Sequence, residues 1–253
     1  MQIDLLHFVA IYVAYAVPIC LLLWVSRRVP ATWPAPPRIV LDRPWLDFSA
    51  AIGAAVLILL LNTAYNTDRL LPLPKNLLLN HLVFLADLAI IWSPLALVLI
   101  LRRQGLETCL LSLRGLPRKL VWAVGMSILG MAVFLVVERR FSALGLAVTL
   151  LWRFDPIQAI QSILQFLGMG FLLVRLAGVA GRTTAALLCG ALYGLVKYPY
   201  LRGAYGMSLF STAGIIAFSI VVALALVYVV FDRGDVLVLA ILHLYLWTLI
   251  QQP

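Results

Sequence analysis

The sequence predicts an all-α fold, a polytopic transmembrane bundle of about eight helices. Hydrophobic residues make up 64% of the chain and charged residues only 11%, whereas roughly a quarter of a soluble globular chain is charged. The mean hydropathy is +1.06, and apolar runs recur close to the about 20 residues that a helix needs to cross a bilayer. Because no polar segment is long enough to fold alone, residues 1–253 are expected to form a single integral membrane domain.

The N-terminal part, residues 1–155, is expected to hold the first four membrane helices and a short apolar segment. The expected helices are Leu5–Trp24, Trp45–Asn62, Leu82–Leu101 and Leu120–Val137. The first of them lacks a basic leader and a small-residue cleavage site, which favours a retained helix over a signal peptide. The most basic loop, residues 102–119, contains a short piece, LETCLLSL, that we expect on the membrane surface.

The C-terminal part, residues 156–253, is expected to supply four more helices. These are Pro156–Leu176, Thr183–Leu201, Leu209–Phe231 and Val236–Ile250. The apolar segment that joins the two parts, Phe141–Trp152, is too short to cross a bilayer. We therefore expect it to be interfacial or re-entrant.

The basic residues indicate orientation in a membrane rather than nucleic-acid binding. Nineteen Lys and Arg against ten Asp and Glu give a net charge of +9, but the basic residues occupy the short gaps between apolar runs, where they contact lipid headgroups. Twelve of the nineteen fall on the side of the 102–119 loop, which predicts that both termini face outward. The expected location is the bacterial inner (cytoplasmic) membrane, with lipids and another membrane protein or a larger membrane complex as partners.

A few polar residues interrupt the apolar helices, and an ionisable group there costs about 2.5–3.5 kcal/mol at the helix centre. Lys197 lies about one turn from the end of its expected helix, so its amine either reaches the interface or is buried. If it is buried, Asp87 and Glu138 are expected at similar depth. We predict an intramembrane ion pair between Lys197 and one of these two carboxylates.

Motifs for phosphate, metal or hydrolytic nucleophile chemistry are missing from the sequence, including HExxH and GxSxG. No metal or cofactor is expected on that basis. The three cysteines have no CxxC spacing and are interpreted as small hydrophobes. His243 lies in the middle of an apolar helix, LVLAILHLYLW, where two interpretations stay open. It is either a packed, hydrogen-bonded side chain or a ligand for a bound cofactor.

The order GFLLVRL, a Gly/Arg turn, AALLCGALYGLVKYP and a late AILHLYLW resembles the CAAX protease and bacteriocin-processing (CPBP) family of intramembrane glutamic endopeptidases. That family shows EExxFRG, then FGxxH, then a final histidine with asparagine four residues later. The resemblance covers about residues 156–250. In this frame the chain keeps Gly170, Gly194, Pro199 and His243.

The chain departs from the family pattern at its polar positions. Leu164 and Gln165 stand where the two glutamates belong, Met169 replaces the arginine, Lys197 replaces the histidine of FGxxH, and Trp247 replaces the asparagine. In that family a glutamate is thought to activate water with help from histidine. Glutamine cannot accept a proton, and losing a general base typically forfeits about 10²–10⁴ in rate. The resemblance therefore implies a degenerate member, a pseudoenzyme with a CPBP-like core in its C-terminal half.

Three functions remain open at this point. The first is a non-catalytic scaffold, chaperone or accessory subunit of a membrane protein complex. The second is a divergent intramembrane endopeptidase that uses Glu138 and His243. The third is a small-molecule, lipid or pigment-binding protein, with His243 as the ligand and Asp87 and Lys197 lining a cavity.

Overall fold

Helices are the only regular elements in the part of the chain that the structure, a computed structural model, describes, and the predicted all-α class is confirmed. The described residues are 5–28, 39, 41–68, 76–152, 155–192, 213–214, 217 and 235–250.

Helices run through most of the described part of the chain. They are α1 (Leu5–Arg28), α2 (Pro44–Asp68), α3 (Leu77–Leu101), α4 (Leu116–Val137), α5 (Leu144–Trp152), α6 (Pro156–Ala180) and α9 (Leu237–Ile250), with two 3-10 turns, η2 (Leu106–Cys109) and η3 (Phe141–Ala143). A further helix occupies residues 182–192 after the break at Gly181. Most of the expected helix Leu209–Phe231 and the second half of Thr183–Leu201 lie outside the described residues.

Four helices are long and apolar enough to cross a membrane, so the chain is a membrane protein. The four segments are Pro44–Tyr65, Leu79–Leu101, Leu116–Val137 and Pro156–Ala180. Three shorter apolar helical segments accompany them, namely Val9–Val25, Phe141–Trp152 and Leu237–Leu246. Phe141–Trp152 is helical and too short to cross, and its interfacial or re-entrant placement stays a prediction.

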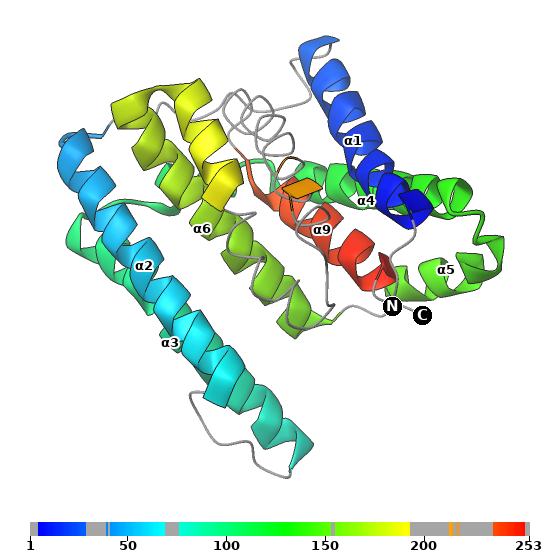
Figure 1. Cartoon of the computed structure of the whole chain (residues 1–253), viewed down its shortest axis with the longest axis horizontal. Coiled ribbons are helices and arrows are strands. Elements are labelled where there is room, and N and C mark those ends of the chain that lie inside the picture. The colour runs from blue at the N-terminus through cyan, green and yellow to red at the C-terminus, as the bar shows by residue number, and fades with distance from the viewer. Residues whose placement is uncertain are drawn as a thin grey trace.

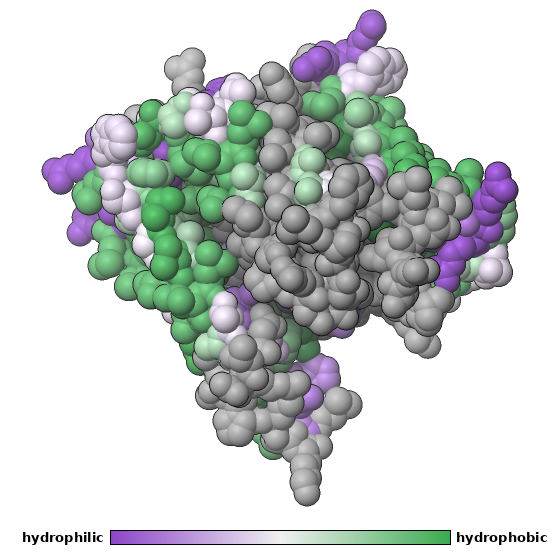
Figure 2. Space-filling view, viewed as in Figure 1, coloured by the Kyte–Doolittle hydropathy of each residue, from purple (hydrophilic) through white to green (hydrophobic). Residues whose placement is uncertain are grey.

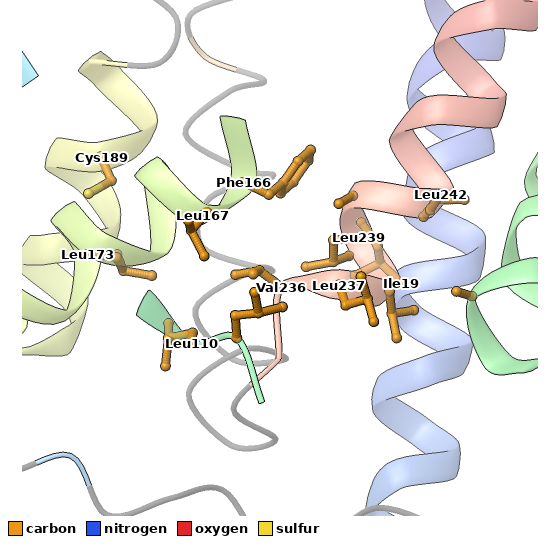
Figure 3. Close-up of a cluster of buried hydrophobic side chains, with 14 of the residues drawn as sticks. Ile19, Leu110, Phe166, Leu167, Leu173, Cys189, Val236, Leu237, Leu239 and Leu242 are labelled. Carbon is orange, nitrogen blue, oxygen red and sulfur yellow. The ribbon is translucent and has the colours of Figure 1, made fainter. Parts of the chain in front are cut away.

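The helices pack as two groups that meet at α6 (Figure 1). In the first group α4 contacts both α1 and α9, and in the second α2 and α3 form a helical hairpin. Helix α6 contacts α9 on one side and the hairpin on the other. The core between α6 and α9 is apolar. Phe166 and Leu167 lie toward Val236 and Leu239, and Leu110, from the loop between α3 and α4, lies beside them (Figure 3).

Glycines allow the closest helix contacts. A Cβ at Gly170 of α6 would collide with the backbone carbonyl of Cys109, and a Cβ at Gly168 would collide with the Trp92 ring of α3. A Cβ at Gly130 of α4 would lie 3.0 Å from the Ala14 carbonyl oxygen of α1, a tight contact rather than a collision. Small residues at helix interfaces let backbones approach in membrane proteins, and here one of the partners is a 3-10 turn rather than a helix.

The structure differs from two sequence expectations. The second half of LETCLLSL does not lie on a surface, because Cys109, Leu110 and Leu111 are all buried against the core. The 3-10 turn η2 and the left-handed Leu110 (φ 60°) redirect this piece into the bundle. In addition, α3 begins at Leu77 rather than Leu82, so Asp87 lies near the middle of its helix and not in the first two turns.

Candidate functional site

Buried charges gather at one end of the molecule, around the loop of residues 102–119. Helices α2, α4 and α9 begin at this end, and α3 and α6 finish there. Four of the ionisable side chains at this end have at most 2% of their surface exposed: Asp47, Lys119, Arg175 and Asp235. Charged residues are almost never fully buried unless they are paired. The role of this site therefore follows from the groups that pair with these four side chains.

The first cluster joins α2, the 102–119 loop and α6 through Asp47 and Arg175. The Asp47 Oδ1 atom accepts hydrogen bonds from Arg102 Nε at 2.8 Å and from Gln104 Nε2 at 3.0 Å. The same Gln104 side chain accepts a hydrogen bond from Arg175 Nη2 through its Oε1 atom. One amide thus bridges a buried carboxylate and a buried guanidinium. Asp47 lies in the first turn of α2, where the helix dipole also favours a negative charge.

Arg175 is fully buried and makes most of the contacts in this cluster. Its Nη1 atom donates to the Thr108 carbonyl at 2.6 Å and to the Phe171 carbonyl at 3.1 Å. Its Nη2 atom also donates to Thr108 Oγ1 at 3.0 Å, and its guanidinium lies 3.8 Å from the centre of the Phe171 ring. Arg175 Nε and Asp47 Oδ2 have no hydrogen-bond partner among the described residues. The planar fork of arginine suits several simultaneous acceptors in a way that lysine does not.

The second cluster joins α4, the same loop and the start of α9 through Lys119 and Asp235. The Lys119 amine forms an ion pair with Asp235 Oδ2 and donates to the Ser112 carbonyl at 2.6 Å. The other carboxylate oxygen of Asp235 accepts from the Leu237 amide at 2.8 Å, which caps the first turn of α9. The Val236 amide donates to the Leu110 carbonyl at 2.8 Å.

Together the two clusters fix the 102–119 loop against four helices. Each of the four buried charges faces an opposite charge or a carbonyl or amide oxygen, so the charges act as cross-links between helix ends. Cys109 lies between the clusters and is fully buried. Burial raises the pKa of its thiol, and the nearby Arg175 opposes that rise. Buried polar contacts therefore hold the helix ends together at this end of the bundle, although most of the chain is apolar.

Sequence reasoning missed this site. Lys119 and Arg175 counted only toward the twelve basic residues on the side of the 102–119 loop, although both side chains are buried. For Arg175 a signal was present, because the run GFLLVRLAGVA places it between apolar residues on both sides. For Lys119 no signal was present, since it stands at the basic edge of a loop.

The predicted site on α9 is a packed histidine. His243 is 8% exposed, and its Nδ1 atom is 2.8 Å from the Tyr15 hydroxyl of α1. The imidazole ring also packs against Phe166 of α6, with ring centres 5.4 Å apart. Gln165 and Met169 are half-buried on α6. Phe166, the residue after Gln165, therefore packs against His243.

The predicted ion pair lies outside the described residues, because Lys197 does, and so does the Trp247 side chain. Asp87 is buried on α3, and its Oδ1 atom has no hydrogen-bond partner in the described part of the chain. Glu138 follows the last residue of α4, and its carboxylate is 3.8 Å from Arg140 Nη1. Among the described residues, no three His, Cys, Asp or Glu side chains group as metal ligands would.

Comparisons of the chain with protein-family models, with curated proteins and with solved structures give no match. The class that the fold itself defines is a helical membrane protein whose helix ends are joined by buried polar clusters. The resemblance to the CPBP family stays a prediction.

Proposed function

We propose that this protein is a non-catalytic, CPBP-like membrane protein that acts as a scaffold, chaperone or accessory subunit in a membrane protein complex. The observation that carries the proposal is a notch of two small residues on the outer face of α2. Ser49 and Gly53 are both exposed and stand four residues apart, so they share one helix face. No described residue lies within 4 Å of the position that a Gly53 Cβ would take.

A glycine in the middle of a helix costs about 1 kcal/mol relative to alanine. At Gly168 and Gly170 a neighbouring group occupies the space that a side chain would fill. Gly125 of α4 is open like Gly53, but of the two only Gly53 has a second exposed small residue, Ser49, four positions away. Gly53 admits nothing from the described part of its own chain. Small residues spaced by four are the usual contact surface for a second transmembrane helix, so a helix of another membrane protein is the occupant that fits.

The surroundings of the notch support lateral docking. Large apolar side chains border it on the same helix, including Trp45, Val56, Leu57 and Leu60, and Leu60 is 62% exposed. Figure 2 shows a continuous hydrophobic surface on the side of the molecule where α2 lies. At one end the hairpin is held by the Asp47–Arg102 contact. A face that is fixed before binding loses less conformational entropy when a partner docks.

The surroundings of His243 support a binding function over proteolysis. Its ring is packed and its Nδ1 atom is hydrogen-bonded to Tyr15, which is what a structural histidine requires. In the CPBP frame the base position holds Gln165, which cannot accept a proton. The endopeptidase alternative depends on Glu138, whose carboxylate lies near Arg140 at the end of α4.

The notch is tested by filling it. We expect Gly53→Leu to fold normally, because the site is open and leucine is a better helix former than glycine. A photo-crosslinking amino acid at Leu57 should give a protein adduct in native membranes, and Gly53→Leu should abolish that adduct. The matched control is Gly125→Leu on α4, another exposed helical glycine with open space around it. Adducts with lipid alone, or adducts that persist in Gly53→Leu, would contradict the proposal.

A further inference from the structure

The segment from Arg139 to Trp152 carries an apolar stripe that the rest of the described chain does not cover. Its members are Phe141, Leu144, Val148 and Trp152, with exposure from 50% for Val148 to 85% for Trp152. Steps of three and four residues place such side chains on one face of a helix. Four large apolar side chains in a row on a short helix need an apolar environment.

The opposite face of the same helix is attached to the bundle. Ala147 is buried, and Leu146, Leu150 and Leu151 pack against the core. Helix α5 contacts α9, and Figure 1 shows that it follows the turn at the C-terminal end of α4 and runs back toward the end of α9. The stripe therefore has a fixed direction relative to the membrane-crossing helices.

Connectivity places this helix at one face of the membrane. It follows directly from the end of α4 at Val137 and precedes the start of α6 at Pro156, and both of these helices are long enough to cross the bilayer. The twelve residues from Phe141 to Trp152 extend about 18 Å as a helix, well short of the roughly 30 Å hydrocarbon core. The segment thus sits where two spans reach the same membrane face.

Arg139, the charged residue next to the stripe, has an unusual backbone conformation. Helix α4 ends in a Schellman motif, in which the Arg140 amide donates to the Leu135 carbonyl at 3.0 Å and the Arg139 amide to the Val136 carbonyl at 3.2 Å. Arg139 takes the left-handed position of this motif, with φ 57°, which favours glycine. Its side chain is exposed and forms no ion pair with any described residue. An arginine is thus placed at a glycine position directly before the stripe.

We propose that residues 139–152 form an interfacial anchor that binds anionic phospholipids. The stripe of Phe141, Leu144, Val148 and Trp152 enters the boundary between headgroups and acyl chains. Arg139 contacts the phosphate groups above it. Such helices combine buried apolar area with attraction to anionic lipids. The proposal is independent of the notch on α2.

The depth of the stripe is the first test. The full chain, with its native cysteines replaced by alanine, is reconstituted in phosphatidylglycerol/phosphatidylcholine vesicles with a nitroxide on a single cysteine at Leu144, Val148 or Arg139. Labels at Leu144 and Val148 should be accessible to oxygen and shielded from a water-soluble nickel chelate, about 5–10 Å below the headgroups, and the label at Arg139 should show the reverse. Free access of the chelate to the stripe, a depth at the bilayer centre, or shielding from both reagents would overturn the proposal.

Lipid preference is the second test. A bimane fluorophore at Val148 is quenched by nitroxide-labelled phosphatidylglycerol or phosphatidylcholine, and the ratio of the two quenching constants reports the local lipid composition. Arg139→Gly removes the charge and relieves the left-handed strain, so the protein should fold at least as well. One basic residue near an anionic surface changes lipid affinity by about fivefold, and the ratio should fall by that factor.

Arg103→Gly is the matched control for this test. Arg103 also has a left-handed backbone (φ 50°), and the same pair of hydrogen bonds closes the end of α3 there, at the opposite end of the molecule. This variant should leave the ratio at Val148 unchanged. The proposal is overturned if Arg139→Gly leaves the ratio unchanged or if Arg103→Gly lowers it equally.

Discussion

Replacing Arg175 with methionine is expected to destabilise the bundle more than any other single change of an arginine in the described chain. Methionine fills most of the space of the arginine stem but offers no donor. It leaves the Thr108 carbonyl and the Gln104 Oε1 atom without the hydrogen bonds that Arg175 now supplies. It also removes positive charge beside Asp47, which keeps only its contacts to Arg102 and Gln104.

The magnitude follows from burial. Arg175 is 0% exposed, and breaking a buried charged network by removing one partner costs about 3–5 kcal/mol. For a chain of this size each kcal/mol lowers the midpoint of thermal unfolding by about 2–4 °C. The expected loss for Arg175→Met is therefore about 6–20 °C. The midpoint of Arg175→Lys should lie between those of the wild type and Arg175→Met, because lysine keeps the charge but loses the fork that reaches four acceptor atoms.

The assay is thermal unfolding of the purified protein in one detergent, followed by tryptophan fluorescence at a fixed scan rate because unfolding of membrane proteins is often irreversible. The control is Arg114→Met, which removes an exposed arginine from the same loop and should shift the midpoint by less than about 2 °C. If Arg175→Met and Arg114→Met unfold within about 2 °C of each other, the reasoning from buried charge is refuted.

Three further changes test the packing around the same core. Lys119→Met should lower the free energy of unfolding by about 3–5 kcal/mol, because it leaves Asp235 buried without its cation. Adding Asp235→Asn should restore most of that loss, and additive losses in the double variant would contradict the pairing. Gly170→Ala should destabilise the protein, because the new methyl group collides with the backbone of η2. Gly125→Ala, in open space, should be neutral or stabilise the protein by up to about 1 kcal/mol. Equal effects of the two variants would contradict the close contact at Gly170. Tyr15→Phe should lower stability by about 0.5–1.5 kcal/mol through loss of its bond to the buried histidine of α9, and an unchanged midpoint would contradict that bond.

Much of the architecture was predictable from local signals. Hydropathy places the apolar helices, Pro156 marks the start of α6, and the polar run after Val137 marks the end of α4. These features depend on neighbours in sequence, which is why they can be inferred from the chain alone. The end of α2 was placed too early, because the helix continues through Asn62 to Asp68.

The buried clusters could not be predicted in the same way. Arg175 and its acceptor Thr108 are 67 residues apart in sequence, and nothing in the local pattern of either residue specifies the other. Counting Lys119 as a loop charge was natural because its neighbours Arg118 and Arg114 are exposed. Its buried partner is Asp235, which lies 116 residues further along the chain and meets it because α9 packs on α4. For Lys197 the expected ion pair stays a prediction.

Co-purification from native membranes in a mild detergent tests the central claim most directly. The tagged wild-type chain, Gly53→Leu and Gly125→Leu are isolated in parallel, and each preparation is assayed for cleavage of a peptide substrate. We predict that wild type and Gly125→Leu retain one stoichiometric membrane protein partner, that Gly53→Leu loses it, and that no preparation cleaves the peptide. A wild-type chain that purifies alone and cleaves the peptide would contradict the account.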